Sequence, residues 1–188
     1  MKRNFICIAL VIGFLFPLPL WADSLAGQSK AAKAVIHEMM MKMQSTMKQA
    51  MKAGGPVSAI QTCNVDAPLV EKAFSKEGWK VARRSLKVRN PSNQPDSWER
   101  RVLLQFEQRK SKGEPVGKME FAEIIETDGK KTFRYMKAIG TKPMCLQCHG
   151  ASLAPNVSAS LEELYPEDQA KGFQVGDIRG AFSLQKSL

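Results

Sequence analysis

The stretch that decides the fold is "KMEFAEIIETDGKKTFRYMKAIG" (118–140), in which two alternating apolar runs flank Asp128-Gly129. Alternation directs every second side chain of a strand to the same face of a sheet. Asp-Gly is a preferred two-residue turn between such strands. The stretch therefore predicts an antiparallel β-hairpin.

The chain before the hairpin is mainly helical in pattern. Residues 24–53 are rich in Ala, Met, Lys and Gln, which are good helix formers, so we expect one long helix there. Gly-Gly-Pro at 54–56 predicts the end of this helix. A second helix is expected over about 57–76, carrying Cys63 and interrupted or restarted near Pro68. An apolar stripe follows the first helix at steps of three and four: Ile36, Met40, Met43, Met47 and Met51.

The remaining elements are shorter and follow from turn and capping signals. The predicted set is a strand over 79–88, a turn over 89–99, a helix over about 97–111 capped by Asp96 or Ser97, a short helix near 158–164 and a strand over 178–186. Helices combined with hairpin-paired strands indicate the α+β class, an antiparallel sheet flanked by helices with a long N-terminal helix. The length of 188 residues favours one domain.

The first 22 residues have the pattern of a secretory signal peptide. Lys-Arg at 2–3 precedes an apolar run over 5–21 that two prolines break near its end. We expect cleavage near Ala22, export to the periplasm and a mature domain of residues 23–188. The alternative is a retained N-terminal anchor helix, for which the run is short. No later stretch is apolar enough to cross a membrane.

The formal net charge is +10, and removal of Lys2 and Arg3 with the signal peptide leaves +8. A positive protein attracts anionic partners such as acidic redox proteins, anionic lipid surfaces or haem propionates. The sequence contains no nucleic-acid-binding motif, and nucleic acid is an unexpected partner outside the cytoplasm.

The stretch "KPMCLQCHG" (142–150) carries the chemistry. Its Cys-x-x-Cys-His pattern places two thiols, Cys145 and Cys148, where they reach the porphyrin vinyl groups of a c-type haem, and His149 where it reaches the iron. Export also leaves three cysteines, an odd number that argues against a plain disulfide framework. The alternatives are a redox dithiol and a zinc site completed by Cys63 or His37. The chain has two histidines, so we expect one haem.

The second iron ligand is left open by the residues alone. Cys63 is a candidate because an unpaired thiol in an oxidising compartment is a liability unless it is buried or bound to metal. His37, Met136, Met119 and an empty position are the alternatives.

Four stretches of the sequence resemble a known family. The matching stretches are "AIQTCNVDAP" (59–68), "RRSLKVRNPSNQPDSWE" (83–99), the haem motif at 142–150, and "YPEDQAKGFQVGDIRGAFS" (165–183). They are similar to exported single-haem c-type proteins whose reference member is a cyanobacterial haem protein found with photosystem II. The resemblance covers about residues 23–188.

The resemblance implies several properties. The fold would be PAS-like, with haem held against the sheet, and the iron ligands would be His149 and a cysteine of the upstream helix, here Cys63. Related domains serve as sensory input modules of chemoreceptors and kinases, whereas this chain would be a free-standing version.

A thiolate ligand favours ferric iron, and its loss on reduction would make a switch. We therefore expect a redox or small-gas sensor, with a low-potential electron-transfer cytochrome as the alternative. We expect no enzyme, because oxygen chemistry needs an acid/base residue at an open site and His37 is the one spare histidine.

Two further expectations concern contacts. Arg89 and Asn93, with Asn90, are candidates for binding the haem propionates, and the alternative is that they build a rigid loop. A homodimer through the Met-rich N-terminal helix is an open alternative to plain packing of that helix.

Overall fold

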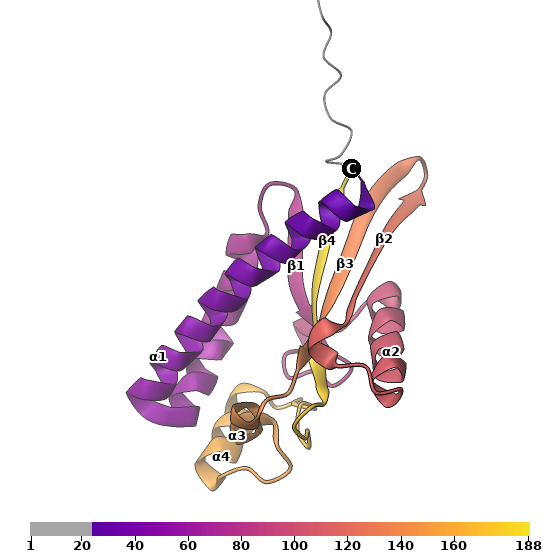
Figure 1. Cartoon of the computed structure of the whole chain (residues 1–188). Helices are drawn as coiled ribbons and strands as arrows, with labels where there is room; N and C mark the ends of the chain where they lie inside the picture. The colour runs from indigo at the N-terminus through magenta and orange to yellow at the C-terminus, as the bar shows by residue number, and fades with distance from the viewer. Residues whose placement is uncertain (1–23) are drawn as a thin grey trace, which may run out of the picture.

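The computed structural model describes residues 24–188, so the predicted signal peptide lies outside the described residues. Its centre is a four-stranded antiparallel sheet in the order β1-β4-β3-β2 (Figure 1). The strands are β1 (Trp79–Arg84), β2 (Glu120–Thr127), β3 (Lys130–Gly140) and β4 (Ile178–Ser187). The helices are α1 (Leu25–Phe74), α2 (Ser97–Ser111), α3 (Leu146–His149) and α4 (Pro155–Leu164). The predicted α+β class with a long N-terminal helix is confirmed.

The predicted hairpin is formed by β2 and β3. These strands pair from Glu120↔Lys137 to Thr127↔Lys130, and the turn consists of Asp128 and Gly129. Both turn residues have positive φ, 52° and 72°, as a two-residue turn of the type I′ class requires. The local sequence signal therefore determines this pairing.

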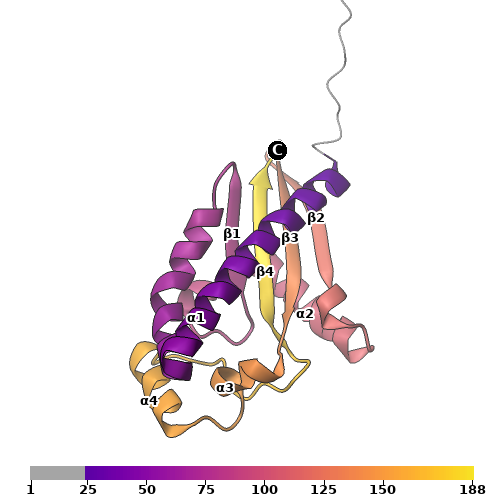
Figure 2. The same cartoon turned by 60° about the vertical axis from the view of Figure 1, so that its left-hand side comes forward.

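Helix α1 contains both predicted N-terminal helices, joined at a kink. Gly54 and Gly55 leave helical geometry, and Gly55 has φ 67° and ψ −156°, a conformation that favours glycine. The second half then runs back beside the first (Figure 2). It continues through Pro68 and ends at Phe74, so the interruption expected near Pro68 is absent from the described helix. Within residues 24–188, no helix has the length and apolarity needed to cross a membrane.

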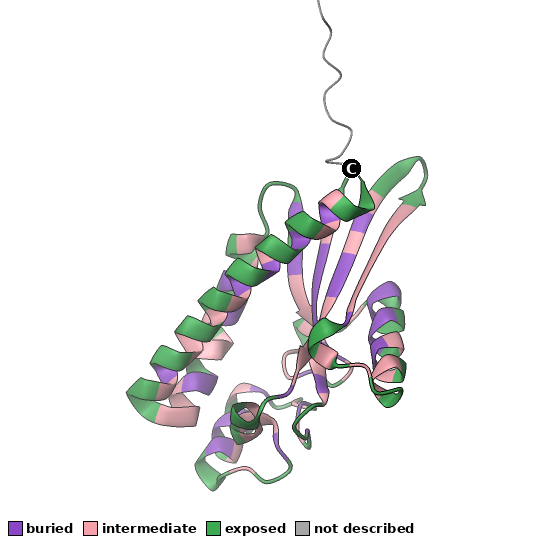
Figure 3. Cartoon of the chain, in the orientation of Figure 1, coloured by how far each residue is buried: buried purple, intermediate pink, exposed green. Residues whose placement is uncertain are grey.

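Two apolar clusters fill the space on the two faces of the sheet. The first joins α1 to β1, β3 and β4 through fully buried residues that include Ile36, Met39 and Phe133. The second joins α2 to the sheet through residues that include Phe106 and Met136. Figure 3 shows the buried positions of α2 on the side toward the sheet. Met39 is completely buried although the predicted stripe omitted it, whereas Met40 is half-buried at the edge of the first cluster.

Two predicted boundaries differ from the structure. Strand β1 ends at Arg84 instead of residue 88, because the Ser85 hydroxyl bonds the carbonyls of Lys87 and Arg179 and the chain turns there. Helix α4 begins at Pro155, which suits the first turn of a helix because proline lacks only an N–H that would be unpaired there. Helix α2 has the predicted bounds, with Asp96 as its N-cap.

A third, smaller cluster joins α4 to the second half of α1. Ile60 of α1 packs with Val157, Leu161 and Tyr165, and Cys148 lies at its edge. This contact brings the helix that carries Cys63 beside the segment that carries the Cys-x-x-Cys-His motif.

Candidate functional site

The Cys-x-x-Cys-His motif follows β3 and spans the end of a 3₁₀ turn and the short helix α3. Strand β3 ends at Gly140, and Thr141 exchanges backbone hydrogen bonds of 2.8 and 2.9 Å with the Gly176–Asp177 turn. A 3₁₀ turn (Pro143–Cys145) then leads into α3. The sheet therefore fixes where the motif begins.

One nitrogen of the His149 ring is held by the backbone. Nδ1 lies 2.8 Å from the carbonyl oxygen of Ala170, so Nδ1 carries the proton and donates it. The lone pair is then on Nε2, the arrangement that metal-binding histidines use. Burial first, and then the nearby Arg179 and Arg89, lower the pKa of His149 to about 2, so the ring is neutral at physiological pH.

A cavity of about 230 Å³ lies in front of this ring. Both halves of α1, the connection after β1, the end of β3 and the motif contribute to its wall. Apolar side chains such as Met47, Met51, Ile60 and Ile139 form part of the lining. Every site residue predicted from the sequence lines this same cavity: Cys63, Arg89, Asn93, Cys145, Cys148 and His149.

The three cysteines of the described chain are free thiols. Burial raises the pKa of Cys63, and Arg83 and Arg89 oppose that effect with their positive charge. Burial likewise raises the pKa of Cys148. The backbone N–H of Lys142 donates to the Cys145 sulfur at 3.4 Å. Two thiols and a neutral imidazole within five residues, with a third thiol on the same cavity, are a donor set that fits a covalently attached haem.

Arg89 connects the segments around the site. Its Nη2 donates to the Cys148 carbonyl and, at 3.4 Å, to the Ala170 carbonyl that also accepts from His149. The same nitrogen lies 3.1 Å from the carboxylate of Asp168. Asn93 lines the cavity at the end of the 3₁₀ turn Pro91–Asn93, and its backbone carbonyl accepts from Ser85. Propionate binding by Arg89 and Asn93 stays a prediction.

Two cavity arginines were missed by the sequence reasoning. Arg83 pairs with Glu71 at 2.8 Å. Arg179 places Nε 3.3 Å from both nitrogens of His149, and its Nη1 donates to Ser85 Oγ and to the Lys87 carbonyl. No local pattern separates these two from the other members of a set of 28 lysines and arginines.

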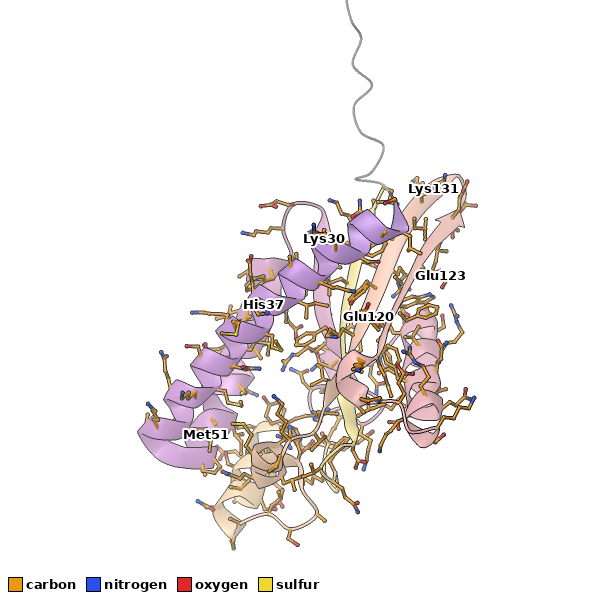
Figure 4. All side chains as sticks on the ribbon, in the orientation of Figure 1. Lys30, His37, Met51, Glu120, Glu123 and Lys131 are labelled. Carbon is orange, nitrogen blue, oxygen red and sulfur yellow. The ribbon has the colours of Figure 1, made fainter. Side chains whose placement is uncertain are left out.

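The other candidate ligands lie elsewhere. His37 is exposed on α1 (Figure 4). Met119 and Met136 are completely buried in the cluster between α2 and the sheet. In the part of the chain that the structure describes, no group of three or more His, Cys, Asp or Glu side chains could hold a bare metal ion.

Comparison with known proteins adds a family. The family model described as Tll0287-like matches residues 23–187. The chain belongs to the Tll0287-like family. The match spans α1 to β4 and includes every predicted site residue. The match confirms that the four sequence stretches point to a Tll0287-like family.

One solved crystal structure is similar to this Tll0287-like chain. It is described as the crystal structure of the cyanobacterial heme-protein Tll0287, with 28% sequence identity and a TM-score of 0.56. The alignment covers 83% of this chain and 93% of that chain. No curated protein matches the chain.

Proposed function

We propose that this Tll0287-like protein binds one c-type haem, held by Cys145, Cys148 and His149, with Cys63 as the second iron ligand. The observation that carries the proposal is the cavity itself. Three free thiols and an imidazole whose Nδ1 is held by Ala170 line one cavity, although Cys63 is far from the others in sequence. The solved relative with 28% identity is named a heme-protein, which supports the same conclusion.

Each residue has a distinct part. Cys145 and Cys148 would attach the porphyrin through thioether bonds, and His149 would offer Nε2 to the iron while its Nδ1–H bond to Ala170 keeps the ring in place. Cys63 would offer its sulfur from α1. A bound haem supplies an iron that exchanges an electron or takes a small gas as ligand.

We further propose that the protein is a periplasmic redox or small-gas sensor. The support lies in how the ligands are distributed over the chain. His149 follows β3 through one 3₁₀ turn, whereas Cys63 belongs to a helix half that is joined to the first half through the Gly54–Gly55 kink. Release of Cys63 would therefore free one helix segment and one coordination position together. The outer side of that segment carries Val65 and Leu69, which are 62% and 59% exposed. The proposal includes the PAS-like fold that the resemblance implies, because related domains serve as sensory input modules.

Covalent attachment is tested by expression with a c-type maturation system. Haem should remain on the chain after denaturing electrophoresis and add the mass of haem to the mature protein. Cys145→Ala and Cys148→Ala should each weaken attachment, whereas Cys63→Ser, the matched control thiol, should keep it. Haem that leaves the wild-type chain on denaturation would refute c-type attachment.

Carbon monoxide separates a sensor from the alternative, a low-potential electron-transfer cytochrome. A sensor that releases Cys63 on reduction should bind CO in the ferrous state. An unchanged six-coordinate ferrous spectrum without CO binding would favour the electron carrier, because its two ligands must survive both oxidation states.

The remaining proposals concern location and partners. We propose that the signal peptide is cleaved near Ala22 and that the mature protein is periplasmic. We propose that its partner is an acidic redox protein or a gas rather than nucleic acid, and that it has no enzymatic activity. N-terminal sequencing of the protein recovered from a periplasmic fraction tests the cleavage, and analytical ultracentrifugation tests a homodimer through α1.

A further inference from the structure

The charges of the cavity are incompletely balanced. Three arginines line it, and two of them have a carboxylate partner: Arg83 pairs with Glu71 at 2.8 Å, and Arg89 pairs with Asp168 at 3.1 Å. Arg179 is different, since among residues 24–188 no carboxylate lies within ion-pair distance of it. Pairing with Glu71 and Asp168 therefore leaves one of the three cavity arginines, Arg179, without a neutralising carboxylate among the described residues.

Arg179 is held in place by neutral partners. Its Nη1 donates to Ser85 Oγ at 3.1 Å and to the Lys87 carbonyl at 3.3 Å, and its guanidinium lies 5.4 Å from the centre of the Phe173 ring. Ser85 Oγ also donates to the Arg179 carbonyl at 2.8 Å, so backbone and side chain are fixed by the same hydroxyl. Nη2 has no hydrogen bond to any described residue.

Burial without an acid partner is costly for a guanidinium. An arginine side chain stays charged at neutral pH, so Arg179 brings a positive charge to the cavity wall. A charged, immobilised arginine with a spare N–H pair on a cavity wall is a binding group for a carboxylate, since the guanidinium fork matches the two carboxylate oxygens.

We propose that Arg179 binds a carboxylate of the molecule that occupies this cavity. The inference rests on the proposed function, under which that carboxylate is a haem propionate. Arg89 then has a different part: its Nη2 joins the Cys148 and Ala170 carbonyls to Asp168, so it is a clamp that positions the motif.

Resonance Raman spectroscopy of the holoprotein tests the assignment, because the bending band of a haem propionate responds to hydrogen bonds at its oxygens. In Arg179→Gln this band should move to lower frequency. Arg179→Lys keeps the charge and should move it less. Arg83→Gln, which removes a cavity arginine already neutralised by Glu71, is the matched control and should leave the band in place.

The outcomes separate this inference from the proposed function. A haem-containing wild type whose propionate bands are the same in Arg179→Gln would overturn the inference alone, as would a shift seen in Arg89→Gln and absent in Arg179→Gln. A wild-type protein without haem would refute the proposed function and the inference with it. Circular dichroism of each variant identifies loss of folding, and Arg179→Lys then provides the second readout.

Discussion

Substitution of Gly180 by alanine should strongly destabilise the protein, because β1 and β4 approach closely at this residue. An alanine Cβ would lie 2.3 Å from the carbonyl oxygen of Arg84 and 3.3 Å from Cβ of Ser85. Carbon and oxygen in such contacts are normally about 3.3 Å apart or more, so β1 would have to retreat by about 1 Å. Gly180 also has φ 156°, a value that L side chains rarely adopt.

Two costs add at this position. Overpacking in a close-packed region costs about 1–3 kcal/mol, and a rare backbone conformation costs about 1–3 kcal/mol. Gly180→Ala should therefore lower the free energy of unfolding by about 2–6 kcal/mol, a large share of the about 5–15 kcal/mol that is typical of domains. Urea unfolding followed by far-ultraviolet circular dichroism measures this loss.

Gly176→Ala is the matched control. Gly176 also has positive φ, 89°, but an added Cβ there would meet nothing within 4 Å. Gly176→Ala should lower the free energy of unfolding only through its positive-φ backbone conformation, by about 1–2 kcal/mol. Equal losses in the two variants would refute the argument that contact with the Arg84 carbonyl is what requires glycine at residue 180.

Further predictions concern the capping of α2 and the packing of α4. Asp96→Ala should cost about 1 kcal/mol in urea unfolding, because Asp96 forms a capping box with Glu99. Burial raises the pKa of Asp96, but hydrogen bonds from the Glu99 N–H and from Arg134 outweigh it and the pKa is lowered. The contribution should thus be complete above the ordinary pKa of 3.8 and fade as pH falls through the lower folded value, so a constant difference between wild type and variant down to pH 2 would contradict it. Leu161→Ala should cost about 2–5 kcal/mol, since Leu161 is fully buried between α4 and α1, and a loss below 1 kcal/mol would contradict that packing.

The parts of the fold that could be predicted are those with local signals. Asp128-Gly129 fixes the hairpin, and Gly-Gly-Pro at 54–56 marks the kink of α1 through backbone preferences of a few adjacent residues. The end of β1 has no such signal. It depends on a hydrogen bond between Ser85 and Arg179, residues 94 positions apart, which no local pattern reveals.

The site residues also include some that a local motif predicts and others that depend on tertiary contacts. Cys145, Cys148 and His149 form a local motif, so their grouping follows from the sequence. Cys63 lines the same cavity because α4 packs on the second half of α1, a tertiary contact for which the sequence offered only an unpaired thiol and a family resemblance. Arg179 could not be predicted, because its distinguishing property is that no carboxylate of the described residues lies within ion-pair distance of it in the fold.

The central claim is that Cys63 of α1 and His149 of α3 bind the same iron. Electron paramagnetic resonance and visible spectra of the ferric holoprotein, recorded for the wild type beside Cys63→Ser, test it most directly. The wild type should be low-spin with a thiolate ligand, and the variant should keep its covalent haem but lose that signature. Identical ferric spectra of the two proteins would contradict the claim.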